Sequence, residues 1–179
     1  EIDLNNNFEI INTIFPQGPA EKGIFDMHII GGQLWAVNGR IDPTYNNGFA
    51  WARIYHYKDF RWTSYLEYLE PSLRGIYDPV SVRINPEDEG NVFIGTWGNG
   101  LLEFDQSLPF KVYRDTNSSL IEREARQNYV GLGELEFDDN NNLWVTNTYT
   151  NNPLAVRKKN GEWETFDLSK HLNSPETSV

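Results

Sequence analysis

The segment Asn91–Asp105, which reads NVFIGTWGNGLLEFD, restricts the possible folds of this sequence more than any other stretch. In it, two short apolar stretches flank a Trp-Gly-Asn-Gly turn at 97–100. Weaker copies of the unit occur at Leu34–Gly39 (LWAVNG) and Leu143–Tyr149 (LWVTNTY), and each leads through a polar loop to another apolar stretch. The chain therefore repeats a strand–turn–strand unit along its length.

A large aromatic residue occupies the same place in each copy, at Trp35, Phe93 and Trp144, with spacings of 58 and 51 residues. Repeats of roughly 40 to 50 residues that are built from four short strands are typical of β-propeller blades. The aromatic content of 14%, with 14 glycines and 9 prolines, fits many short strands joined by tight turns. We therefore predict an all-β fold, namely a fragment of a β-propeller.

The repeat divides the chain into about three four-stranded antiparallel blades and one orphan strand. Alternation over Val80–Ile84 places Val80, Val82 and Ile84 on one face of an inner strand. We expect strands at 91–96, 101–105, 142–147 and 154–158, with Phe93 and Trp144 buried. The expected parts of this partial propeller (1–179) are an orphan outer strand at 8–15, blades at 23–67, 79–115 and 130–168, and a frayed tail at 169–179.

Two segments between the blades have a different character. The stretch 66–77 has the composition of a linker that includes a short helical turn. The stretch 116–128 contains Glu122, Arg123, Glu124 and Arg126, and it is the main candidate for a helix, with a charged and solvated surface.

Charge and cysteine content exclude several classes of function. The net charge of -11 opposes binding to nucleic acid and to anionic lipid. No stretch approaches the ~18 apolar residues that a membrane-spanning helix requires. There is no cysteine, so the chain has no disulfide, thiol nucleophile or thiolate metal site. The chain begins with EIDLNNN, without Met or a signal peptide, and we expect it to be part of a longer protein.

The loops between the second and third strands of each blade are expected to emerge on one face of the propeller. Aromatic rings beside amide and guanidinium donors suit a sugar, because its C–H face stacks on a ring while its hydroxyls accept and donate hydrogen bonds. Asn and Gly are also common in turns for geometric reasons, and the aromatic rings would equally cover the rims of the blades. The candidate ligand-binding residues are Arg40, Asp42, Tyr45, Asn47, Trp97, Asn99, Tyr149, Asn151 and Asn152, in loops 40–48, 97–100 and 148–153.

Three other patterns are more simply explained by structure than by chemistry. The Asp138–Asn142 stretch opens like a Ca²⁺ loop, but Leu143 replaces the required glycine, so we read it as a turn. The three histidines lack the spacing of a zinc site. Glu134 and Glu136 share one face of an inner strand, and paired carboxylates alone would suggest glycoside hydrolysis. Alternating acids on a strand are common, so we expect no catalytic residues, metal or cofactor.

The segment Val80–Asp105 resembles the regulator-propeller repeat, which builds the periplasmic sensor propellers of hybrid two-component regulators. Its pattern is a Gly-Asn turn, an apolar pair, Gly-Thr-x-Gly-x-Gly-Leu and an aromatic-Asp ending. The residues that match are Gly90, Asn91, Gly95, Thr96, Gly98, Gly100, Leu101, Phe104 and Asp105.

A second resemblance covers more of the chain. The segment 16–65, with its QGPA, LWAVNG, YNNG and WTSY stretches, is similar to the N-terminal propeller of PorZ-type proteins of the type IX secretion system, and so is LWVTNTYTNNPLAVRKKNGEWETF at 143–166. This family departs from our sequence in having more than three blades.

The resemblance implies a non-catalytic scaffold or binding module. It would sit in the periplasm or at the outer-membrane surface, within the complex that attaches secreted cargo to lipopolysaccharide. Its partners would be other proteins of a secretion or signalling complex, with glycan or lipopolysaccharide as a possible contact. The alternative is a ligand-sensing propeller fragment of a hybrid two-component regulator.

An arc of three blades must leave two apolar sheet faces open, since each blade of a propeller packs against two neighbours. We expect Trp35 and Trp144 to leave parts of these faces exposed to water. Such a chain would associate with a second copy of itself or with the remaining blades of its parent propeller.

Overall fold

The computed structural model describes residues 2–3, 9–10, 18–123 and 126–171 of the chain. Strands β1 (Ile2–Asp3) and β2 (Glu9–Ile10) pair antiparallel as a small sheet of their own. The remainder of the orphan strand expected at 8–15, and the tail from 172 onward, lie outside the described residues.

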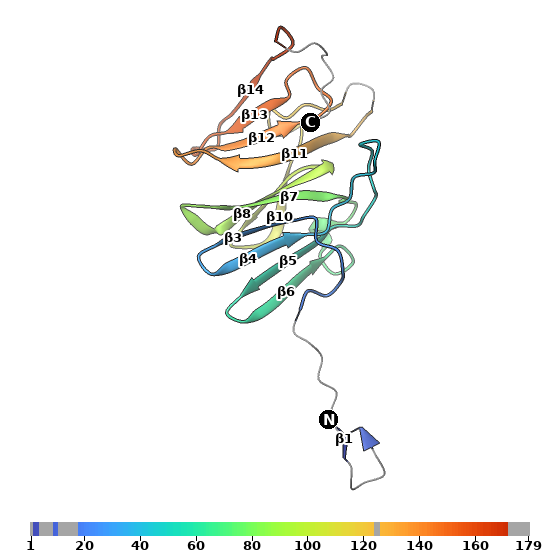
Figure 1. Ribbon diagram of the computed structural model, residues 1–179. Helices are drawn as coiled ribbons and strands as arrows, with labels where there is room; N and C mark the ends of the chain where they lie inside the picture. The colour runs from blue at the N-terminus through green and yellow to red at the C-terminus, as the bar shows by residue number, and fades with distance from the viewer. Residues whose placement is uncertain (1, 4–8, 11–17, 124–125, 172–179) are drawn as a thin grey trace.

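Twelve strands form three antiparallel blades that lie one above another in Figure 1. A 3-10 turn, η1 (Pro71–Leu73), lies in the first linker, as predicted. The first blade contains β3 (Asp26–Ile30), β4 (Gln33–Val37), β5 (Arg53–Lys58) and β6 (Arg61–Leu66); the second contains β7 (Pro79–Asn85), β8 (Asp88–Gly98), β9 (Gly100–Asp105) and β10 (Ser107–Tyr113); the third contains β11 (Val130–Phe137), β12 (Leu143–Asn147), β13 (Leu154–Arg157) and β14 (Trp163–Phe166). The predicted propeller fragment is confirmed.

The turn between β8 and β9 shows why the sequence requires glycine there. Thr96 pairs with Gly100 across the turn, and Gly100 has a φ of +84°. A Cβ at Gly100 would collide with the carbonyl oxygen of Tyr113 on β10. Only glycine tolerates this backbone conformation and this close approach at little cost.

The alternation of side chains packs each blade against the next. Val82 and Ile84 of β7 join Trp35 of β4 in a core between the first and second blades. Phe93 of β8 and Leu135 of β11 belong to a separate core between the second and third blades. The ends of β8 and β11 also pair directly, so the second and third blades share one continuous sheet.

The helix expected over 116–128 is absent from the described residues of that stretch, and the prediction is wrong. The Ser118 hydroxyl donates to the Arg114 carbonyl, and the Asn117 amide bonds the backbone at Arg114 and Val112. Short polar side chains compete in this way with helical hydrogen bonds. The Asn147 side chain then accepts from the Ile121 N–H at 2.6 Å and donates to the Ile121 carbonyl at 3.1 Å, which ties the segment to β12 of the third blade.

The two outer faces of the arc differ from expectation in which residues are exposed. Trp35 is only 1% exposed, because it faces the second blade and stacks on His56 and Tyr65. The prediction that Trp35 is partly exposed to water is therefore wrong. Met27 and Ile29 of β3 lie on the open face instead and are 57% and 60% exposed. On the third blade, Trp144 is half-buried and stacks on Phe166, whereas Phe93 is fully buried as predicted.

Candidate functional site

The long loop 38–52 is held against the second blade by the buried carboxylate of Asp78. Oδ1 of Asp78 accepts from the Ala50 N–H at 2.7 Å, and Oδ2 accepts from the Phe49 N–H at 2.9 Å and from Asn47 Nδ2 at 3.2 Å. Burial raises the pKa of Asp78, and the hydrogen bonds from Ala50, Phe49 and Asn47 lower it less than burial raises it. These hydrogen bonds therefore hold the loop at the cost of a desolvated carboxylate.

Two aromatic side chains meet beneath this loop. The indole N–H of Trp97 and the hydroxyl of Tyr149 each donate to the Tyr45 carbonyl at 3.0 Å. The rings of Trp97 and Tyr149 pack edge to face, with centroids 6.2 Å apart. Trp97 is 1% exposed, so its indole supports the loop and presents no stacking surface to a ligand.

Arginine side chains from the segment between the second and third blades lie at the same end of the strands as the loop 38–52. The Arg123 guanidinium lies 4.1 Å from the centre of the Tyr149 ring, and that of Arg126 lies 4.7 Å from the centre of the Tyr129 ring. Burial raises the pKa of Tyr129 to about 12, so it remains neutral there. Arg126 also donates to Asn47 Oδ1 at 3.0 Å.

These loops enclose a cavity of about 200 Å³ that we call the loop cavity. Phe49, which is 59% exposed, packs edge-on against Tyr77, so the cavity has aromatic walls. Its polar groups are amides and one guanidinium, which suit a hydroxylated or anionic ligand. The residues that line it are Asn47, Phe49, Tyr77, Gly98, Asn99, Arg126, Gln127, Asn128 and Tyr129.

The structure brings only some of the predicted site residues into the loop cavity. Asn47 and Asn99 line it, although Asn99 Oδ1 is occupied by the Tyr77 N–H. Tyr45, Trp97 and Tyr149 form its support. Sequence reasoning missed Phe49 and Tyr129, which lie just outside the predicted loop 40–48 and the predicted helix 116–128. It missed Arg126 because it assigned 116–128 to a solvated helix.

The other predicted residues lie outside the cavity and have local roles. Asp42 caps its own turn by accepting from the Asn46 N–H and from the hydroxyl and N–H of Thr44, which lowers its pKa. Asn152 donates to Thr165 at 3.2 Å, within the third blade. Arg40 and Asn151 are exposed.

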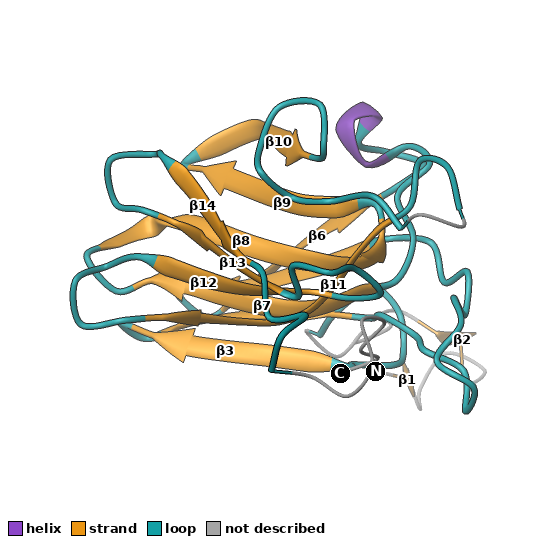
Figure 2. Ribbon diagram, turned by 90° about the horizontal axis from the view of Figure 1, so that it is seen from above, coloured by secondary structure: helices purple, strands orange, loops and turns teal. Residues whose placement is uncertain are grey.

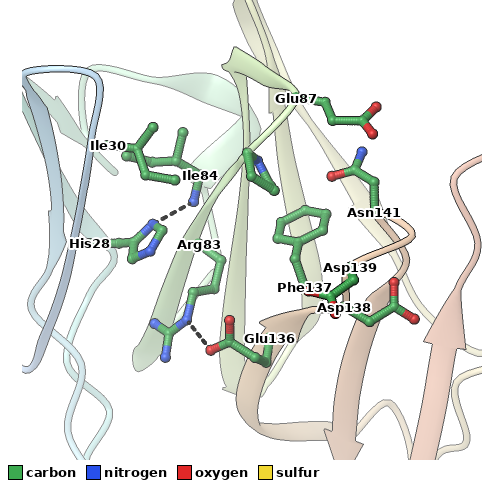
Figure 3. A pocket seen from close by; sticks show the side chains of 11 residues that line it. His28, Ile30, Arg83, Ile84, Glu87, Glu136, Phe137, Asp138, Asp139 and Asn141 are labelled. Atoms are coloured by element: carbon green, nitrogen blue, oxygen red, sulfur yellow. Dashed lines mark hydrogen bonds and ion pairs between the residues drawn. The ribbon is translucent and has the colours of Figure 1, made fainter.

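A second cavity, of about 380 Å³, opens at the opposite end of the strands, among the inner strands of the three blades. We call it the axial cavity. His28 of β3, Arg83 of β7 and Glu136 of β11 point into it (Figure 3). Figure 2 looks down on the arc and shows these inner strands, β3, β7 and β11, side by side. Its remaining lining residues are Ile30, Ile84, Pro86, Glu87, Phe137, Asp138, Asp139 and Asn141.

Arg83 connects the three blades beside the axial cavity. Its guanidinium pairs with Asp26 of the first blade at 3.1 Å and with Glu136 of the third at 3.3 Å, and it also contacts Glu134. Burial lowers the pKa of Arg83, but these three carboxylates outweigh it and raise the pKa overall. The paired carboxylates at 134 and 136 are thus ion-pair partners of a structural arginine.

The Asp138–Asn142 stretch is a turn, as predicted. Asp138 accepts from the backbone of Asn140 and Asn142 and from the indole N–H of Trp144. The hydrogen bonds from Asn142 and Trp144 lower the pKa of Asp138 to about 2. In the part of the chain that the structure describes, no three His, Asp or Glu side chains are grouped to hold a metal ion.

Comparison with known proteins gives matches among solved structures. PorZ, a bacterial surface component of the type IX secretion system of Porphyromonas gingivalis, superposes with a TM-score of 0.74 and 24% identity over 87% of this chain. The extracellular domain of a hybrid two-component system from B. thetaiotaomicron superposes with a TM-score of 0.57 and 15% identity over 87% of this chain. The chain has the propeller fold of both.

The expected likeness to a PorZ-type propeller is therefore confirmed at the level of the fold. This chain spans 21% of the PorZ chain and 20% of the two-component chain, so each is much longer. An α-L-arabinofuranosidase from Clostridium thermocellum also matches, with a TM-score of 0.39, 17% identity, and coverage of 79% of this chain and 55% of its own. No family model and no curated protein matches the sequence.

Proposed function

We propose that this chain is a non-catalytic binding scaffold within a longer protein at the bacterial cell surface, and that its loop cavity contacts a glycan such as the sugar of lipopolysaccharide. The observation that carries this proposal is the arrangement around the loop cavity. Phe49 and Tyr77 offer aromatic surface, and the Arg126 guanidinium and the Asn128 amide offer donors. A rigid aromatic wall beside adaptable donors is how proteins recognise sugar rings.

Two further features support a scaffold. Each carboxylate of the Glu134–Glu136 pair is bound to Arg83, which accounts for their position without catalysis. The two structural relatives with the higher TM-scores are described as a surface component and an extracellular domain, which agrees with the proposed location at the cell surface. The described residues include no helix with the length and hydropathy needed to span a membrane.

The test is binding of purified lipopolysaccharide and of a glycan panel to the immobilised chain. Phe49→Ala should weaken binding about five-fold, since one aromatic stacking platform contributes on the order of 1 kcal/mol. Arg126→Gln should weaken binding of phosphorylated or carboxylated glycans more than that of neutral ones. The matched control is Phe60→Ala. It removes an 88% exposed ring from the β5–β6 turn, which lies at the end of the strands opposite the loop cavity.

Unchanged binding in both loop variants would remove the loop cavity from consideration. The alternative function, ligand sensing for a two-component regulator, predicts a different preference. In that case short free oligosaccharides would bind the loop cavity and lipopolysaccharide would not compete with them.

A further inference from the structure

Three aromatic side chains form an exposed cluster beside the loop cavity. Trp51 and Tyr77 lie opposite each other in an antiparallel bridge, with ring centroids 4.3 Å apart, and Phe49 packs edge-on against Tyr77 at 5.9 Å. Trp51 is 42% exposed and Phe49 is 59% exposed. We call Phe49, Trp51 and Tyr77 the aromatic ridge. Single exposed apolar residues are common in proteins, whereas a contiguous exposed cluster marks a site of interaction.

The backbone beneath the aromatic ridge is fixed by hydrogen bonds. Main-chain hydrogen bonds of 2.8 and 3.1 Å join the segments 50–52 and 76–78 on either side of the Trp51–Tyr77 pair. Asn38 Nδ2 also donates to the Trp51 carbonyl at 3.0 Å. The side chains of such a cross-strand pair lie close together, and rings held in place beforehand lose little freedom when a ligand stacks on them.

Phe49 has a backbone conformation that bulky residues rarely adopt. Its φ is +53°, which lies in the left-handed region. The Asp78 carboxylate accepts from the Phe49 N–H at 2.9 Å and stabilises this conformation, which keeps the ring at the surface beside Tyr77. Strained residues of this kind cluster at ligand-binding sites.

The aromatic ridge continues the wall of the loop cavity. Phe49 and Tyr77 line that cavity, whereas Trp51 does not. Because Trp51 lies against Tyr77, its ring extends the aromatic surface beyond the cavity. The ridge has no charged side chain, and its rings can stack on the apolar C–H faces of neutral sugars.

We propose that Trp51 and Tyr77 form a second sugar subsite next to the loop cavity, so that the chain binds at least two successive neutral sugar residues of a glycan. This subsite rests on the proposed function, since it extends the same glycan site. One sugar residue would occupy the loop cavity against Phe49, and the next would stack on Trp51. The cavity volume of about 200 Å³ is below the roughly 300–1,000 Å³ of ligand pockets, so the cavity itself holds less than an oligosaccharide.

The experiment is an NMR titration of the 179-residue chain with saccharides of increasing length. The probes are glucose, mannose and galactose, and the di-, tri- and tetrasaccharides of each. The indole N–H resonance of Trp51 reports on the ridge, and the backbone amides of Gly98 and Asn99 report on the loop cavity. In a series that binds the loop cavity, we expect the disaccharide to bind about five-fold more tightly than the monosaccharide and to shift the Trp51 resonance.

Variants test the two subsites separately. Trp51→Ala should weaken binding of the disaccharide about five-fold and that of the monosaccharide less than about two-fold, whereas Phe49→Ala should weaken both. Trp51→Phe keeps a smaller ring and should restore part of the affinity for the disaccharide. The matched control is Trp62→Ala, because Trp62 also packs against a cross-strand tyrosine, Tyr57, at 5.1 Å, but lies beside the β5–β6 turn at the opposite end of the strands.

The outcomes distinguish the second subsite from the loop cavity. If a monosaccharide binds and Phe49→Ala weakens it, but the disaccharide gains nothing or Trp51→Ala loses nothing, the second subsite is overturned and the loop cavity stands. If no saccharide shifts the loop-cavity amides, the proposed function fails and the subsite fails with it. An equal loss in Trp62→Ala would overturn the subsite, because the effect would then be a general one of losing an aromatic pair. Tighter binding of Nα-acetyl-phenylalanine amide than of any saccharide at Trp51 would overturn it in favour of an aromatic side chain of a protein partner.

Discussion

Replacement of Asp78 by Asn tests how the loop cavity is built. The change keeps the shape of the side chain, and asparagine tolerates the φ of +51° at this position. One amide oxygen can still accept from the Ala50 N–H. The new NH₂ group, however, faces two donors, the Phe49 N–H and Asn47 Nδ2, which both lose their acceptor.

The magnitude follows from these two losses. Hydrogen bonds to a charged group contribute about 1.5–3 kcal/mol each, so the gross loss is about 3–6 kcal/mol. Against this, the buried carboxylate of the wild-type chain carries a desolvation cost, visible in its raised pKa, that a neutral amide avoids. We expect a net reduction of about 2–4 kcal/mol in the free energy of unfolding, together with faster hydrogen exchange at Phe49 and Ala50.

The pH dependence of that reduction has a definite sign. The pKa of Asp78 is raised on folding, so the folded chain holds this proton more tightly than the unfolded chain does. Between the ordinary value of 3.8 and the higher folded value, the contribution of Asp78 to stability therefore falls as pH rises. Asp78→Asn lacks this contribution, so the difference between wild type and variant should be larger near pH 4 than near pH 7.

Urea denaturation followed by tryptophan fluorescence at both pH values gives the two differences. Asp105→Asn serves as the matched control and should change stability by less than about 0.5 kcal/mol, because its side chain is exposed. A reduction in the free energy of unfolding for Asp78→Asn below that value, or one that grows with pH, would refute the account in which Asp78 holds the loop 38–52.

Two more predictions concern the segment before the third blade and the open face of the first blade. Asn147→Ala should lower the free energy of unfolding by about 2–3 kcal/mol and expose the segment 116–123 to proteolysis, because the buried Asn147 amide bonds both backbone groups of Ile121. The control Asn152→Ala, which loses one hydrogen bond to Thr165, should lower the free energy of unfolding by less than about 1 kcal/mol. The open face of the first blade should promote self-association, so changing Met27 and Ile29 to Thr should shift the chain toward monomer in size-exclusion chromatography with light scattering. A wild-type chain that is already a stable 20.7 kDa monomer at micromolar concentration would contradict this.

The strands were predictable because each blade carries its own local signals. Gly100 in the β8–β9 turn and the alternation of Val82 and Ile84 in β7 favour the observed conformation through local geometry. The segment 116–128 was not predictable in this way. Its structure depends on the Asn147 side chain, which is distant in sequence and becomes its partner only after the third blade has formed.

The candidate site likewise contains residues that local sequence signals identify and residues that only long-range contacts bring together. Asn47 and Asn99 were found because turn residues between aromatic strands are visible in the sequence. The support from Asp78 was missed because a single acid before a proline gives no sign of burial. Trp97 was predicted as a ligand-binding residue, and its burial could not be predicted, since a tryptophan at a turn looks the same whether it faces solvent or packs under the Tyr45 backbone.

Both cavities are lined by residues from all three blades in the described part of the chain, although its outer blade faces are open. The loop cavity takes Asn47 from the first blade, Asn99 from the second and Tyr129 from the entry to the third. The axial cavity likewise takes side chains from β3, β7 and β11. Met27 and Ile29, on the open face of the first blade, line neither cavity. Further blades would cover those residues, whereas the aromatic walls and donors proposed for glycan binding are already present in this chain. Glycan binding at the loop cavity can therefore be tested on this chain alone.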